Sequence, residues 1–137
     1  MEQKKNGRIK HLGFSTHGDM PVMKRFLEAY GKDMEFCQIQ LNFMDKNFQA
    51  GVEGLKYAAE KGLDVIIMEP LKGGRLTDFV PPTVQKLWDE AETQKTPAEW
   101  AFKWLAAFPE VKLMLSGMSS RDQLMQNIET ISNTNNF

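Results

Sequence analysis

The sequence has 137 residues, of which 42% are hydrophobic and 26% are charged, and its formal net charge is −1. This size and composition suit one globular domain, residues 1–137, and the near-neutral charge argues against general binding to nucleic acid or to anionic membranes. The only cysteine, Cys37, excludes an internal disulfide framework and a cysteine-rich metal site. No apolar run is long enough to cross a membrane and the first residues do not resemble a secretory signal, so we expect a cytoplasmic protein.

Strand-like and helix-like segments alternate along the chain, and each strand is followed by one or two helices. Strands are marked by short apolar or alternating runs, and helices by apolar side chains that recur every three or four residues. In chain order, the sequence predicts strand 9–15, helix 20–30, strand 36–42, helix 48–60, strand 64–70, helices 83–92 and 97–108, strand 111–116 and helix 121–131. Four consecutive βα units with short connections imply a parallel sheet joined by right-handed crossovers.

The second predicted strand, FCQIQLN at residues 36–42, alternates apolar side chains with amides. Because successive residues of a strand point to opposite faces, Gln38, Gln40 and Asn42 share one face and the apolar residues share the other. The apolar face is expected to meet a core. The amide face meets either water or the lumen of a ligand site.

The later elements carry clearer local signals. Residues 64–70 are a continuous apolar run, which is typical of a strand covered on both faces. Thr96 and Pro97 have the residue types of an N-cap and a first helical position. Ser120 and Gln123 have the spacing of a capping box that opens the last helix.

Two architectures agree with this order of elements. One is a small doubly wound sheet, and the other is half of an eight-stranded (βα) barrel, whose complete form usually needs about 250 residues. In both, ligands bind at the carboxyl ends of the strands. Polar and glycine-rich residues gather at each of these ends, at residues 15–18, 40–42, 68–75 and 116–120.

Several of these residues have two interpretations. The helix start at Ser120 could hold a phosphate or could simply be capped, and the run Lys72–Arg75 could wrap a pyrophosphate or form a surface turn. His17 could donate a proton or be a hydrogen-bonded loop residue. For these three we favour the structural alternative. Glu69 could equally be a general base or a carboxylate at the rim of a site.

Other residue types that could bind ligands are expected to be structural. His11 falls inside the first predicted strand. The methionines nearest the strand ends are expected to line the core or a pocket: Met68, Met114 and Met118. The three tryptophans are expected to pack between helices rather than stack on nucleotides: Trp88, Trp100 and Trp104.

Five segments, taken together and in this order, resemble the aldo-keto reductase family: IKHLGFSTH, CQIQLNFMD, GLKYAAEKGLDVIIMEPLKGGRL, TPAEWAFKWL and LSGMSSRDQLMQNIE. The resemblance runs from about Gly7 to Ile131 and is strongest to a bacterial branch, some members of which end in a ferredoxin-like segment. It implies an α/β fold, specifically a parallel (βα)4 half of a (β/α)8 TIM barrel, strands five to eight. The family reduces carbonyls by hydride transfer from a nicotinamide cofactor, usually NADPH.

The resemblance implies roles for residues at the nicotinamide end of the cofactor. Gln38 and Ser15 match residues that hold the carboxamide, and Thr16 stands where the family has an asparagine. Met68 falls where many members place a tyrosine that stacks on the nicotinamide ring, so stacking would be weaker here. The loop along the pyrophosphate continues with Glu69, Pro70 and Leu71.

The adenosine end is implied in the same way. The matching residues are Gly117, Met118, Ser119, Gln123, Gln126 and Asn127, of which the last two match a pair that contacts adenine. The family often recognises the 2′-phosphate of NADP with Lys and Arg at the positions of Gly117 and Gln123. The choice between NADP and NAD therefore stays open, with Arg121 as a candidate substitute.

The resemblance does not extend to the catalytic residues. The family's catalytic Asp, Tyr, Lys and His lie on the first half of the barrel, and nothing in this chain matches them. Without a positioned acid, hydride transfer to a carbonyl is not supported, so we expect little or no turnover by this chain alone. We also expect no metal site.

Two functions follow, with a small doubly wound nucleotide binder as a more distant third. The chain is either the cofactor-binding half of an oxidoreductase or a non-catalytic half-barrel that serves as a binding or assembly module. The expected partners are a nicotinamide cofactor and, in a complete enzyme, a small carbonyl substrate. Because four parallel strands cannot close a cylinder, we also expect a homo-oligomer.

Overall fold

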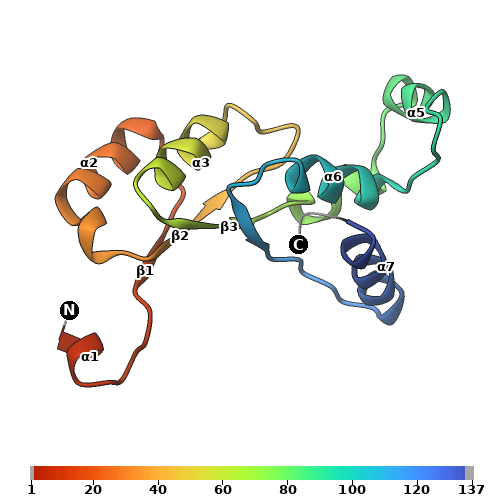
Figure 1. Ribbon diagram of the computed structural model, residues 1–137. Coiled ribbons are helices and arrows are strands. Elements are labelled where there is room, and N and C mark those ends of the chain that lie inside the picture. The colour runs from red at the N-terminus through yellow and green to blue at the C-terminus, as the bar shows by residue number, and fades with distance from the viewer. Residues whose placement is uncertain (1, 135–137) are drawn as a thin grey trace.

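The computed structural model describes residues 2–134, so Met1 and residues 135–137 of the predicted domain lie outside it. A four-stranded parallel sheet runs through the molecule in the order β1-β2-β3-β4 (Figure 1). The strands are β1 (Gly13–Thr16), β2 (Phe36–Gln40), β3 (Asp64–Met68) and β4 (Val111–Met114). The α-helices are α1 (Glu2–Lys5), α2 (Met20–Tyr30), α3 (Gly51–Glu60), α4 (Arg75–Asp78), α5 (Pro82–Asp89), α6 (Pro97–Ala106) and α7 (Arg121–Ser132), and Gly31–Asp33 and Lys72–Gly74 form 3-10 turns.

The core lies between one face of the sheet and the helices α2, α3 and α6. On β2 and β3 the side chains that face these helices have no exposed surface: Cys37, Ile39, Val65 and Ile67. They pack against buried residues of the helices, among them Met23, Leu27, Leu55, Ala58 and Leu105. The prediction that the apolar face of residues 36–42 meets a core is confirmed.

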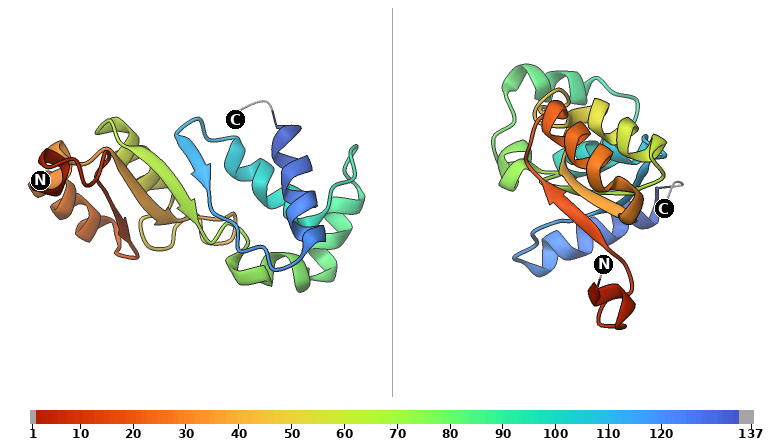
Figure 2. Two further views of the ribbon diagram at one scale, coloured as in Figure 1. Left: turned by 90° about the horizontal axis from the view of Figure 1, so that it is seen from below. Right: turned by 90° about the vertical axis from the view of Figure 1, so that its left-hand side faces the viewer.

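The opposite face of β1, β2 and β3 carries no helix (Figure 2, left). On this face Ile66 and Met68 of β3 are half-buried, so the prediction that strand 64–70 is covered on both faces is wrong. A doubly wound sheet reverses its strand order and has helices on both faces. Because this sheet keeps sequential order and is covered on one face, it is half of a (β/α) barrel.

The first strand is shorter than predicted, which changes the setting of His11. β1 begins at Gly13, so His11 lies before the strand and is exposed. Its Nδ1 lies 2.6 Å from Oε2 of Glu35, whose other oxygen is paired with Lys4 of α1. Hydrogen bonds from Lys4 and then from His11 lower the pKa of Glu35 to about 2. The prediction that His11 belongs to a strand is therefore wrong.

Helix boundaries also differ where the backbone is left-handed. α3 begins at Gly51 rather than at residue 48, because Gln49 and Gly51 have φ angles of 57° and 56°. A Cβ at Gly51 would lie 2.5 Å from the carbonyl oxygen of Lys46, so glycine is required there. The predicted start of α6 is confirmed, with Thr96 and Glu99 forming a capping box. The short helices α1 and α4 were not predicted.

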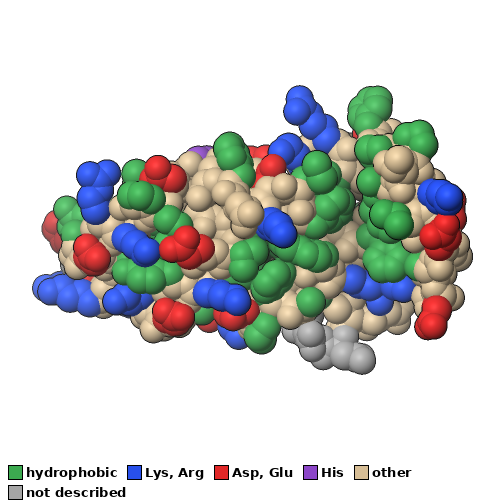
Figure 3. All heavy atoms as spheres, turned by 90° about the horizontal axis from the view of Figure 1, so that it is seen from above, with side chains coloured by type: hydrophobic (Ala, Val, Ile, Leu, Met, Phe, Trp, Pro, Cys, Tyr) green, Lys and Arg blue, Asp and Glu red, His purple; other side chains and the backbone are tan. Residues whose placement is uncertain are grey.

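The surface of the molecule differs from end to end. Mixed acidic and basic side chains cover the end that carries α2, and larger groups of hydrophobic side chains lie toward the end that carries α5 (Figure 3). Among the large hydrophobic side chains of the described residues, Phe79, at 79%, and Leu87, at 67%, are the most exposed. Within residues 2–134, none of the helices combines the length and the apolar character that a bilayer span needs.

Candidate functional site

The amides of residues 36–42 lie at the carboxyl end of β2, and most of them do not face water. Gln40 is 5% exposed and Asn42 has no exposed surface. Both donate to Oδ2 of Asp45, over 2.7 Å from Gln40 and 3.2 Å from Asn42. The amide face of this strand therefore ends in a largely buried carboxylate.

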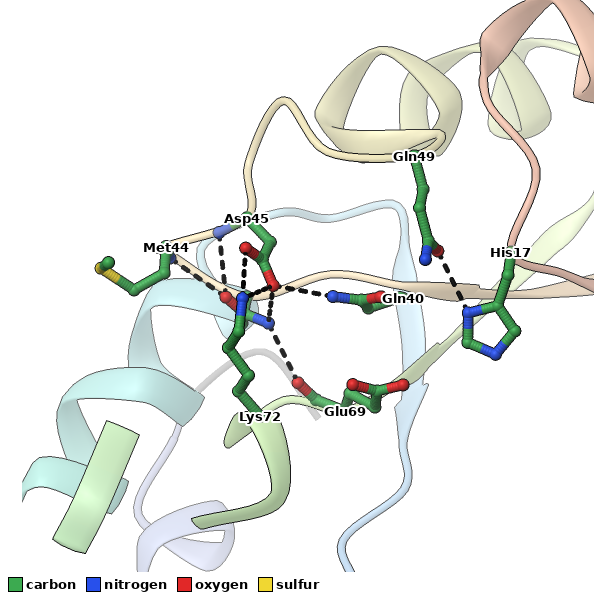
Figure 4. A network of polar contacts seen from close by, with 8 residues as sticks. His17, Gln40, Met44, Asp45, Gln49, Glu69 and Lys72 are labelled. Atoms are coloured by element: carbon green, nitrogen blue, oxygen red, sulfur yellow. Dashed lines mark hydrogen bonds and ion pairs between the residues drawn. The ribbon is translucent and has the colours of Figure 1, made fainter. Parts of the chain in front are cut away.

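Asp45 joins the loop after β2 to the loop after β3 (Figure 4). Lys72 Nζ lies 2.6 Å from Oδ1 and 2.5 Å from Oδ2 of Asp45, and Asn42 Nδ2 donates to the carbonyl oxygen of Glu69 over 3.2 Å. Burial raises the pKa of Asp45, but hydrogen bonds from Lys72, Asn42 and Gln40 outweigh it, so the pKa is lowered overall. The carboxylate is charged and bridges the two loops.

This bridge holds a loop that is locally strained. Glu69 and Lys72 have φ angles of 55° and 51°, and Gly73 and Gly74 follow with 64° and 87°. A non-glycine residue in the left-handed region costs roughly 1–3 kcal/mol and persists only where contacts fix it. The bonds to the Glu69 carbonyl and to Lys72 Nζ supply those contacts.

No role for Asp45 was predicted from the sequence. The signal that was available is a carboxylate shortly after the end of a strand, three residues beyond Asn42. Its charged partner, Lys72, is 27 residues away, and only the adjacency of β2 and β3 brings the two together.

At the nicotinamide end, the structure brings together three of the four predicted residues. Ser15 of β1 pairs in register with Gln38 of β2, and Gln38 Nε2 lies 3.4 Å from Sδ of Met68 on β3. The hydroxyl of Thr16 instead accepts a hydrogen bond from the Gly18 amide over 2.9 Å. Thr16 alternates with Ser15 along the strand, so it does not join the row of Ser15, Gln38 and Met68.

A polar cavity of about 430 Å³ lies between the loops after β3 and β4. Six of the predicted cofactor contacts line it: Glu69, Pro70, Leu71, Gly117, Ser119 and Gln123. Residues far apart in the chain therefore converge on one cavity. Two lining residues, Glu69 and Asp78, are carboxylates, and the lining contains no Lys or Arg within the described part of the chain.

The start of α7 is occupied by its own side chains. Oε1 of Gln123 accepts from the amides of Ser119 and Ser120 over 2.8 and 3.2 Å, and Ser120 Oγ accepts from the Gln123 amide over 3.2 Å. The capping interpretation of Ser120 is confirmed. A phosphate at this helix start would have to displace the Gln123 side chain.

The run Lys72–Arg75 is divided between two environments. Gly73 and Gly74 line the polar cavity, whereas Lys72 pairs with Asp45 and Arg75 lines a separate apolar cavity. The alternative in which both cations wrap a pyrophosphate is therefore wrong. Only backbone of this run faces the polar cavity.

The remaining predicted contacts lie beyond the polar cavity. Met118 and Asn127 line a groove between α6, β4 and α7, where Asn127 Nδ2 donates to Ser116 Oγ over 2.9 Å. Gln126 is half-buried and its carbonyl oxygen accepts from the Thr130 hydroxyl. These three residues are close to the cavity along the chain but do not line it.

Two of the residues with two interpretations, His17 and Glu69, are exposed. His17 is exposed and its Nδ1 lies 3.2 Å from Oε1 of Gln49, as expected of a hydrogen-bonded loop residue. Glu69 is exposed at the mouth of the polar cavity, which matches a rim carboxylate. Among the described residues no group of three or more His, Cys, Asp and Glu side chains could hold a metal ion.

The structure combines a parallel sheet in sequential strand order, helices on one face of it, and polar, glycine-rich loops at the carboxyl ends of the strands. These features define a protein of the (β/α)-barrel class. The sequence model of the Aldo/keto reductase family matches residues 1–135, so the chain belongs to this family. Its fold is similar to that of aldo-keto reductase AKR11C1 from Bacillus halodurans, in both holo and apo forms, with a TM-score of 0.78 and 22% identity. The alignment covers 97% of this chain and 48–49% of that protein, so the chain spans about half of its length. No curated protein matches the sequence.

Proposed function

We propose that this chain is the cofactor-binding half of an aldo/keto reductase-type oxidoreductase, equivalent to strands five to eight of the barrel. Residues 1–137 would form one cytoplasmic unit that carries NAD(P)H in a complete enzyme that reduces small carbonyls. The proposal is carried by the convergence of six predicted contacts on one polar cavity. Because the expected catalytic residues belong to the other half, we expect no turnover by this chain alone.

The predicted residues on β1, β2 and β3 fit the neutral parts of the cofactor. The Gln38 amide and the Ser15 hydroxyl lie on adjacent strands and can hydrogen-bond a carboxamide, and the thioether of Met68 offers a polarizable apolar contact to a ring. Bound NAD(P)H would supply a hydride, and these residues would orient the ring that carries it.

The charged part of the cofactor is served less well. Glu69 and Asp78 line the cavity without a compensating cation, and Arg121 is exposed and does not line it. A pyrophosphate would find the backbone of Gly73 and Gly74 but two nearby carboxylates. We therefore expect weak binding and no preference for NADPH over NADH.

Titration of the chain with NADPH, followed by cofactor fluorescence and by calorimetry, tests the proposal. We expect a saturable signal in the millimolar range that weakens about tenfold in Gln38→Leu, since a hydrogen bond to the carboxamide is lost. Gln85→Leu is the matched control, because Gln85 lies exposed on α5. Absence of saturation at millimolar cofactor contradicts the proposal.

A second candidate, an assembly module, is favoured by the free edges of the sheet. β1 and β4 each have one unpaired edge. Leu113 of β4 and Leu115 just after it are 45% and 43% exposed, and Val22 and Tyr30 of α2, the helix that follows β1, are 43% and 55% exposed. Paired with a second copy, β4 could meet β1 twice and complete eight strands.

Light scattering coupled to size exclusion at micromolar concentration tests this homo-oligomer. We expect the mass of a dimer, and Leu113→Lys should shift the protein toward the monomer because it places a charge on the proposed contact. A compact monomer that does not bind a hydrophobic dye contradicts self-association without affecting the cofactor proposal.

A further inference from the structure

An apolar cavity lies away from the proposed cofactor site, between α5, α6 and the loop after β2. It has a volume of about 510 Å³ and shares no lining residue with the polar cavity. The three tryptophans of the chain, Trp88, Trp100 and Trp104, all line it. A second apolar cavity of about 310 Å³ adjoins it and shares Phe43, Met44, Val84 and Trp88. The two together form one elongated apolar site.

The walls of this site are aromatic and incompletely packed. Trp88 and Trp100 stack with ring centroids 6.3 Å apart, and Phe43 meets Trp88 edge-on at 6.5 Å. Helix α5, which carries Trp88 and Val84, has no buried residue. The tryptophans therefore pack between helices, as expected, but leave a concave apolar surface that a ligand can cover.

The charges around the site have one sign. Lys103 lines the larger cavity, and Lys72 and Arg75 line the smaller one, while neither lining includes an Asp or Glu. Lys72 is neutralised by Asp45. Lys103 and Arg75 form no ion pair with another described residue. Two uncompensated cations thus border an apolar surface.

The site also lies away from the free edges of the sheet. Its loop follows β2, and its helices follow β3, the two central strands. Pairing at β1 and β4, in a dimer or in a complete barrel, adds strands next to these two edge strands and not next to β2 or β3. The larger groups of hydrophobic side chains in Figure 3 lie toward the α5 end of the molecule, which is also the end that carries this site.

We propose that this site, at Phe43, Trp88, Trp100, Lys103 and Arg75, binds an elongated anionic amphiphile such as a medium-chain alkyl carboxylate. The chain covers the apolar walls, and the carboxylate pairs with a free cation at the border. Binding requires no cofactor, so this site stands independently of the proposed oxidoreductase function.

Intrinsic fluorescence reports on this site directly, because every tryptophan lines it. The test titrates the full chain with dodecanoate below its micelle concentration and compares dodecanol and dodecylammonium of equal chain length. We expect a saturable change in tryptophan emission, with dodecanoate bound roughly tenfold or more tighter than dodecylammonium. Circular dichroism at each end point checks that the fold is retained.

A matched pair of variants assigns the head-group contact. Arg75→Met/Lys103→Met is expected to weaken dodecanoate roughly tenfold and to leave dodecanol unchanged. Lys56→Met/Lys86→Met removes the same net charge from exposed positions that do not line the site and is expected to bind as the parent does. Equal affinity for the three head groups, an unchanged double variant or no saturable emission change overturns the proposal.

Discussion

The two ends of this molecule are built differently. From β1 to β3 the sheet and helices α2 and α3 enclose a core whose central side chains, among them Met23, Leu55 and Ile67, have no exposed surface. From α4 to α7 the packing is less even: α6 adds Leu105 to the core, but α5 has no buried residue, and on α7 Met125 and Ile128 are 53% and 50% exposed. The difference indicates that folding free energy is concentrated in the first region and exposed apolar surface in the second.

The largest effect is expected from a cavity in the first region. Leu55→Ala removes a fully buried side chain from α3 and is expected to lower the free energy of unfolding by about 2–5 kcal/mol. Leu87→Ala, on exposed α5, is expected to change it by less than about 0.5 kcal/mol. Urea denaturation followed by circular dichroism measures both. Similar losses in the two variants would contradict the division.

The bridge between the loops after β2 and β3 should rank next. Asp45 is 13% exposed and Lys72 31% exposed, so Asp45→Asn removes a largely buried charge pair. We expect a loss of about 2 kcal/mol in the free energy of unfolding, the usual size for hydrogen bonds to a charged group. Lys24→Gln is the control, because its pair with Glu53 is exposed on both sides and should contribute little. Equal losses in the two variants would argue against a special role for Asp45.

Acid should remove the same contribution. The folded-state pKa of Asp45 is lowered, so its stabilisation is fully present above the unfolded pKa of an aspartate, about 3.9, and is lost as pH falls through the lower folded value. The difference in stability between the parent and Asp45→Asn should therefore be constant near neutral pH and shrink below about pH 4. A difference that does not change with pH would show that the variant acts by packing alone.

The buried thiol offers a probe of the first region alone. Cys37 has no exposed surface in the folded protein. This burial raises the pKa of its thiol to about 12, so the thiol stays protonated. We expect labelling by a thiol reagent only through unfolding of the β2 core, slowed in the parent and accelerated in Leu55→Ala. Labelling as fast as that of a denatured control would contradict a closed core.

Local patterns predicted the elements well where the signal lies within a few residues. The capping boxes at Thr96 and Ser120 and the apolar face around Ile39 are examples, since each depends on neighbours in the chain. The start of α3 was missed because left-handed backbone at Gln49 leaves little trace in composition. The charged bridge at Asp45 was missed because it depends on which loops become adjacent.

The candidate site was predicted in the same uneven way. The resemblance named Glu69 and Gln123 as contacts, and the fold brings them to one cavity. It did not predict that the Thr16 hydroxyl accepts a local hydrogen bond from Gly18. Nor did it predict that Gly73 and Gly74 line the cavity while Lys72 and Arg75 do not. Side-chain direction depends on the three-dimensional neighbours of each loop, which a motif does not contain.

The smallest expected effect concerns the loose region and its choice of cofactor. The cavity that includes Gly117 and Gln123 has no cation, and a Cβ at Gly117 would meet nothing within 4 Å, so a side chain can be added there. Gly117→Lys/Gln123→Arg should raise NADPH affinity about tenfold and leave NADH within about threefold, because only NADPH carries the 2′-phosphate that two cations can pair with. The variant loses the Gln123 side chain that accepts from the amides of Ser119 and Ser120, which is expected to lower the free energy of unfolding by about 1 kcal/mol or less.

Paired fluorescence titrations with the two cofactors measure the ratio of their affinities. Gln123→Met, which loses the same cap without adding a charge, is the control. An equal gain for NADH and NADPH would show that the cations act on the shared pyrophosphate, and would place the adenosine end of the cofactor away from α7.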